Sequence, residues 1–88
     1  LPVIEAMACG TPVITSNTTS LVEIANNSAI LVDPLNHTSI TDGIKRIYNN
    51  NPLITKLIHQ GLENSYQFQW NKSKSDLISI IKKNRGNK

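Results

Sequence analysis

Residues 1–14, LPVIEAMACGTPVI, constrain the fold of this chain more than any other segment, because they combine a helix start, a glycine stop and a strand. Pro2 suits the first turn of a helix, where its fixed φ is already helical and its missing N–H costs nothing. Gly10 provides a left-handed stop, and Thr11-Pro12 prevents the helix from continuing. The helix presents a broad apolar face made of Val3, Ile4, Met7 and Ala8.

Two short strands are predicted downstream of this helix. Val13–Thr15 is a β-branched run bounded by proline and polar residues, and Ala29–Val32 is an apolar run that ends before an Asp-Pro pair. A short helix, Leu21–Ala25, connects them and stops at Asn26-Asn27. A strand, a helical crossover and a second strand form a right-handed βαβ unit, so we expect two adjacent parallel strands.

The C-terminal half of the chain is predicted to form three helices. The first spans residues 38–49 and carries the apolar stripe Ile40, Ile44, Ile47 and Tyr48. The second begins with Asn51 as N-cap and Pro52 as its first residue, and its buried face is Leu53, Ile54, Leu57, Ile58 and Leu62. Asn71 is predicted to cap a third helix, which carries Leu77, Ile78, Ile80 and Ile81. Trp70 at this junction is expected to be a packing anchor rather than a sugar-stacking platform.

These elements predict an α/β fold with two short parallel strands, flanking helices and a helical C-terminal half. A chain of 88 residues is small for a domain, and it buries only about 60% of its unfolded surface. Its own core is therefore marginal. No apolar stretch approaches the roughly 18 residues that a transmembrane helix requires.

Glu5 is the carboxylate of the opening segment, and we expect it to be buried near the start of the first helix. An acid in the first turn stabilises a helix through the macrodipole. The first interpretation is therefore that Glu5 is a stabilising helix-start charge. A helix N-terminus also offers unpaired N–H groups that suit a pyrophosphate. A carboxylate accepts through two oxygens and can bind both hydroxyls of a ribose at once. The second interpretation is therefore a sugar-nucleotide site.

The opening segment resembles the donor-binding segment of retaining GT-B glycosyltransferases of family 4, often called group 1. In that family the segment reads roughly E-G-F-G-L-P-x-x-E-A-M-A-C-G-T-P-V-I, with two glutamates in an E-x7-E signature. This chain matches from Leu1 onward, so Glu5 corresponds to the second glutamate and the first has no counterpart. The resemblance implies that the backbone at Leu1 and Val3 lies beside the donor diphosphate and that Glu5 binds the ribose 2′ and 3′ hydroxyls.

The resemblance also implies an assignment for the whole chain. Residues 1–88 would be the C-terminal part of the donor-binding, Rossmann-like lobe of a GT-B glycosyltransferase of the hexosyltransferase type. The first part of that lobe, the other lobe and the phosphate-neutralising basic residues would lie outside it, so no catalytic residue is expected here. The substrates would be a nucleotide-diphospho-sugar and a carbohydrate or lipid-linked acceptor, without cofactor or metal. Glu23 also falls on a family pattern, but we expect it to satisfy nearby backbone N–H groups rather than bind the donor.

The alternative function is a non-catalytic homologue that serves as an interaction or membrane-surface module. Six basic residues and Asp76 give residues 72–88 a charge of +5, whereas residues 1–71 carry −2. A basic amphipathic end can bind an anionic membrane, but a solvated, frayed terminus is the simpler expectation. Nucleic acid is not an expected partner, because no base-stacking aromatic pattern is present. We expect a cytoplasmic protein. The alternative is a protein that is peripherally bound at the cytoplasmic face of the membrane.

The remaining reactive side chains give no sign of a site. Cys9 cannot form an internal disulfide, because it is the single cysteine, and we expect it to be a buried, inert packing residue. His37 and His59 are isolated in the sequence and are expected to be surface or capping residues. No Cys/His cluster has metal-ligand spacing.

Overall fold

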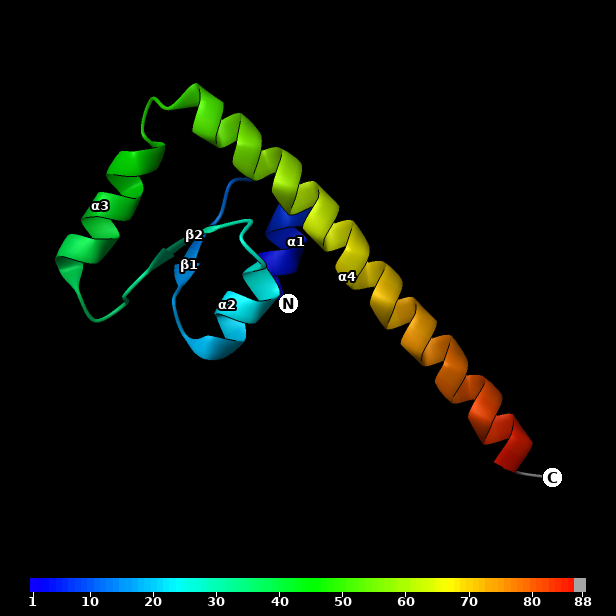
Figure 1. The fold of residues 1–88 in the computed structure, drawn as a ribbon. Coiled ribbons are helices and arrows are strands. Elements are labelled where there is room, and N and C mark those ends of the chain that lie inside the picture. The colour runs from blue at the N-terminus through cyan, green and yellow to red at the C-terminus, as the bar shows by residue number, and fades with distance from the viewer. Residues whose placement is uncertain (87–88) are drawn as a thin grey trace.

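The computed structural model describes residues 1–86, with side chains for residues 1–83. A small α/β body is followed by one long helix (Figure 1). The elements in chain order are α1 (Pro2–Ala8), β1 (Ile14–Ser16), α2 (Thr19–Ala25), β2 (Ile30–Val32), α3 (His37–Ile47) and α4 (Asn51–Gly86). Within the described residues, none of the helices combines the length and apolar character needed to cross a bilayer.

The predicted βαβ unit is confirmed. Strands β1 and β2 are parallel, and Ile14 pairs with Ile30, Thr15 with Leu31 and Ser16 with Val32. Pairing extends by one hydrogen bond at each end, since Ile30 N donates to Val13 O at 2.9 Å and Asn17 N donates to Val32 O at 2.9 Å. Each strand begins one residue later than the sequence pattern predicts.

The helix ends follow the expected local chemistry. Gly10, immediately after the α1 cap, has φ of 75°, and Asn26, which ends α2, has φ of 47°. Both residue types tolerate the left-handed region better than others do. Helix α3 begins at the N-cap Asn36, whose side chain accepts a hydrogen bond from Ser39 N at 3.2 Å.

The prediction of two helices after residue 50 is wrong, because α4 runs without a break for 36 residues. Asn71 lies exposed in its middle and caps no helix. Asparagine costs a helix interior only a fraction of a kcal/mol, about 0.7 at most relative to alanine, so it does not stop a helix without proline or glycine beside it. The start is also shifted: Asn50, rather than Asn51, accepts the capping hydrogen bond from Leu53 N, at 3.2 Å.

The core consists of two clusters. One lies between α1, α2 and α4 and is made of Ile4, Met7, Val13 and Ala25, with Phe68 packed against it. The other lies between the sheet, α3 and α4 and is made of Ile30, Val32 and Leu57, with Ile14, Ile40, Ile47 and Leu53 around it. The predicted α3 stripe is therefore half wrong: Ile44 is 53% and Tyr48 75% exposed. Gly43 instead packs on the sheet, and because it has no side chain, α3 can lie close to Val32.

The molecule is elongated, because α4 extends well past the α/β body (Figure 1). The radius of gyration is 16.7 Å and the longest dimension is 58 Å, whereas a compact domain of this length would have a radius of gyration of about 12 Å. Every side chain from Gln69 to Lys83 is exposed. Trp70 is 59% exposed within a continuous helix, so its predicted role as a packing anchor at a helix junction is wrong.

Candidate functional site

The start of α1 is the centre of the predicted donor site. Its N-cap residue is Leu1, and the structure shows no side-chain cap at this end of the helix. Pro2 contributes no N–H, so the first amide donors of the helix are those of Val3 and Ile4. The amides of a first helical turn have no intrahelical acceptor. An anionic ligand can therefore be bound here by backbone groups and the positive end of the helix.

Glu5 lies at the same end of α1, and its backbone N–H donates to Leu1 O at 3.0 Å. Its carboxylate is 81% exposed, so the expectation that Glu5 is buried is wrong for this chain. Glu5 lies in the first turn of α1. Of the predicted site residues, Leu1 and Glu5 are brought together at the surface, while Val3 is half-buried beside the first core cluster.

The start of α1 lies near one end of the sheet. The chain reverses between α1 and β1, so the start of α1 lies toward the carboxyl end of β1 (Figure 1). Both strands end there and lead into helix starts, β1 through Asn17 and Thr18 to α2, and β2 through Asp33 to α3. Ligands of open α/β sheets bind outside the carboxyl ends of the strands. The predicted donor site is therefore at the edge where this architecture places ligands.

Other residues singled out from the sequence lie elsewhere. Cys9 is exposed, so the expectation of a buried cysteine is wrong; it is the C-cap of α1, at the surface end of the helix. His37 and His59 are exposed, as predicted. Glu23 is also exposed, and among the hydrogen bonds between described residues none ends on its carboxylate, so its predicted structural role is not borne out. Within residues 1–86, no group of three acidic, His or Cys side chains could hold a metal ion.

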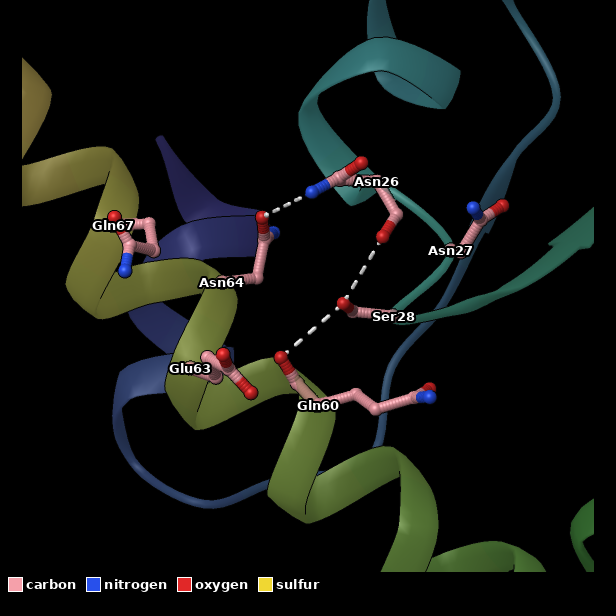
Figure 2. Close-up of a pocket in the computed structure, with 7 residues that line it drawn as sticks. All are labelled: Asn26, Asn27, Ser28, Gln60, Glu63, Asn64 and Gln67. Carbon is pink, nitrogen blue, oxygen red and sulfur yellow. Dashed lines mark hydrogen bonds between the residues drawn. The ribbon is translucent and has the colours of Figure 1, made fainter.

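Figure 2 shows a polar hollow of about 220 Å³ between the end of α2 and α4. Its centre is Asn64, whose Nδ2 donates to Ile24 O at 2.9 Å and to Ala25 O at 3.4 Å. Ser28 Oγ lies across from it and donates to the carbonyls of Asn26 and Gln60. These polar groups largely satisfy one another, so the hollow is a joint between α2 and α4. This joint is not predictable from the sequence, because the partner of an asparagine within an apolar helical pattern is known only from the fold.

This chain is similar to several known proteins. The family model described as "Glycosyl transferases group 1" matches residues 1–64, which is the whole α/β body and the first part of α4. The chain is 32% identical over 82 residues to the O-antigen chain mannosyltransferase B of Escherichia coli. It is 30% identical over 83 residues to the sucrose-phosphate synthase of Spinacia oleracea.

The fold is also similar to that of a solved relative. The structure of a sucrose-phosphate synthase from Thermosynechococcus elongatus matches with a TM-score of 0.68 and 28% identity over 91% of this chain. The chain covers 23% of that protein, 22% of the mannosyltransferase and 8% of the spinach synthase. It thus spans about a quarter or less of the length of these relatives, and it has the predicted architecture of a partial Rossmann-like lobe of a GT-B fold.

Proposed function

The chain belongs to the glycosyl transferases group 1 family, and we propose that it forms the C-terminal part of the donor-binding lobe of a glycosyltransferase. The enzyme transfers a hexose from a nucleotide-diphospho-sugar to a carbohydrate or lipid-linked acceptor. One observation carries the proposal for this segment: an exposed carboxylate, Glu5, lies in the first turn of a helix whose start has no side-chain cap. A nucleoside diphosphate needs both features, one for its ribose and one for its phosphates.

Each proposed contact has a physical basis. The backbone at Leu1 and Val3 lies beside the diphosphate, where N–H groups and the helix dipole offset its charge. The Glu5 carboxylate accepts hydrogen bonds from both ribose hydroxyls, and its exposure leaves it open to a ligand. Binding would withdraw the carboxylate from water, and these charge-assisted hydrogen bonds would replace those to solvent.

The proposed reaction proceeds with retention of configuration. The sugar–phosphate bond breaks, the nucleoside diphosphate leaves with the electron pair, and the acceptor hydroxyl attacks from the same face while losing its proton. Oriented backbone and side-chain donors stabilise the charge that develops on the leaving phosphate. Residues 1–88 contribute donor binding to this step, and the groups that contact the transferred sugar and the acceptor belong to other parts of the enzyme.

The test is Glu5→Gln in the enzyme as expressed from its own gene. We expect the affinity for the nucleoside diphosphate to fall by about 1 to 3 kcal/mol, because a neutral amide loses the charge-assisted hydrogen bonds. Calorimetric titration measures this change. Glu63→Gln makes the same substitution on an exposed position of α4 and should leave the affinity unchanged. An unchanged affinity in a folded Glu5→Gln enzyme would reduce Glu5 to a helix-start charge.

The second candidate is a non-catalytic homologue that acts as an interaction module. The observation in its favour is the part of α4 that extends past the body with every described side chain exposed. The gene sequence upstream of Leu1 discriminates between the enzyme and the interaction module. An upstream Glu-Gly-Phe-Gly or close variant, together with a further Rossmann-like lobe, supports the enzyme, whereas a genuine start codon at or just before Leu1 supports the module.

A further inference from the structure

Asn64 of α4 lies where α1, α2 and α4 meet. Its Nδ2 donates to Ile24 O at 2.9 Å, and the same nitrogen lies 3.4 Å from Met7 Sδ. Its Oδ1 accepts a hydrogen bond from Asn26 Nδ2 at 3.4 Å (Figure 2). One carboxamide thus contacts the last turns of two helices whose starts lie at the carboxyl end of the sheet.

Gly61, one turn before Asn64, places the backbone of α4 directly against α1. A Cβ added at Gly61 would meet Met7 Cγ at 3.2 Å and Met7 Cα at 3.7 Å. Met7 is fully buried, and Ile4, one turn earlier, is buried as well. The contacts of α4 therefore hold α1 near Met7, whereas the start of α1 has no side-chain cap.

This contact lies close to the proposed site for the sugar nucleotide. Glu5 is two residues before Met7, which is about 3 Å along the axis of α1. Because α1 is a single helix of seven residues, a shift of Met7 against α2 or α4 moves the Glu5 carboxylate by a similar distance. A displacement of about 1 Å at a functional group can cost about a hundredfold in activity.

We propose that Asn64 is a positioning residue for the sugar nucleotide. By bonding the end of α2 while it contacts Met7, its carboxamide holds α1 where Glu5 meets the ribose. The proposal rests on the role proposed for Glu5 above. It gives Asn64 no contact with the substrate, because the groups that Asn64 contacts lie in the last turns of α1 and α2, away from the helix starts.

The test is calorimetric titration of the protein, as expressed from its own gene. The diphosphates of adenosine, guanosine, uridine, cytidine and thymidine are titrated in turn, and the tightest binder is used for the variants. We expect Asn64→Ala to weaken its binding about fivefold in a folded protein. No binding of any of the five would overturn the role of Glu5 and this proposal with it.

Two further variants accompany Asn64→Ala. Asn26→Gly removes the hydrogen bond to Asn64 Oδ1, and glycine tolerates the left-handed backbone at this position, where φ is 47°. This gentler change should weaken binding about twofold. Gln67→Ala is the matched control, because Gln67 is an exposed amide of α4 that lines the same hollow. Its affinity should equal that of the unaltered protein.

A double-mutant cycle with Glu5→Gln separates positioning from stability. If Asn64 acts through Glu5, the factor by which Glu5→Gln weakens binding should be at least about threefold smaller in the Asn64→Ala protein. A role in stability alone gives the same factor in both backgrounds. That result would overturn the proposal, as would unchanged affinity in folded Asn64→Ala and Asn26→Gly proteins. If Glu5→Gln by itself leaves the affinity unchanged, the role of Glu5 is what fails, and the positioning role fails with it.

Discussion

A single asparagine joins α2 to α4. The last carbonyls of a helix have no intrahelical donor, and Asn64 supplies one from 40 residues along the chain by donating to Ile24 O at 2.9 Å. The same amide nitrogen lies 3.4 Å from Met7 Sδ in the fully buried part of α1. Asn71, seven positions later, has no such environment and is exposed to solvent.

The two asparagines should respond in opposite ways to alanine. Asn64→Ala leaves the end of α2 without its donor, and we expect the free energy of unfolding to fall by about 1 to 3 kcal/mol. Asn71→Ala improves helix propensity at an exposed position and should raise stability by a few tenths of a kcal/mol, about 0.5. Urea unfolding of the two variants beside the unaltered protein measures the difference. Equal losses would mean that the joint in Figure 2 contributes nothing.

Residue-scale predictions succeeded where the determinant is local. The left-handed stop at Gly10 and the end of α2 at Asn26 depend on the residue's own backbone preference, and both are observed. The burial of Glu5 and Cys9 was predicted wrongly, because both lie on the side of α1 that the described residues leave uncovered. Burial depends on neighbours that a local pattern does not contain. The assignment of Leu1, Val3 and Glu5 to a donor site remains a proposal.

Among the elements, the βαβ unit was predictable and α4 was not. A β-branched run and an apolar run with a short helix between them leave few topologies, and the parallel pairing follows. The end of a helix is harder to predict when the sequence offers only an asparagine, because the cost of continuing is small. Phe68 gives a reason why α4 continues past Ser65. Its side chain packs against the first core cluster and extends the body-facing side of α4.

The approach of α3 to the sheet supports a prediction about Gly43. A Cβ added at Gly43 would lie 2.6 Å from Val32 Cγ1, and the β-branched side chain of Val32 has little rotamer freedom to move away. We expect Gly43→Ala to lower the free energy of unfolding by about 1 to 2 kcal/mol, since overpacking at so short a distance costs about 2 to 3 kcal/mol and the gain in helix propensity is about 1 kcal/mol. Thermal melts followed by circular dichroism measure the loss.

Gly61→Ala is the matched control for this change. It is also a buried helical glycine, but its added Cβ would meet Met7 Cγ at 3.2 Å. A methionine side chain is flexible and can move by a few tenths of an ångström. The same gain in helix propensity should then leave Gly61→Ala within about 1 kcal/mol of the unaltered protein. If the two alanine variants melt alike, the contact with Val32 does not set the position of α3.

At the scale of the whole molecule, the described residues form an incomplete body with a long extension. A two-stranded sheet gives little independent stability, and the buried apolar core consists of seven residues. Residues 69–83 of α4 gain no burial against the body. The bacterial mannosyltransferase and the solved synthase are about four times longer than this chain. We expect the segments that this chain does not cover to supply both further stability and the catalytic groups.

Residues 1–88 expressed alone should therefore be marginally stable and inactive. We expect a shallow urea transition and no transfer from a panel of labelled sugar nucleotides to carbohydrate or lipid-linked acceptors. The chain offers Glu5 and a helix start for the donor, but the resemblance assigns the first glutamate, the phosphate-neutralising residues and the acceptor lobe to other segments. The longer protein from the same gene is the positive control. Measurable transfer by residues 1–88 would show that the family assignment of these roles is wrong here. A steep, concentration-independent melt would show that two strands and a seven-residue core suffice for a stable fold.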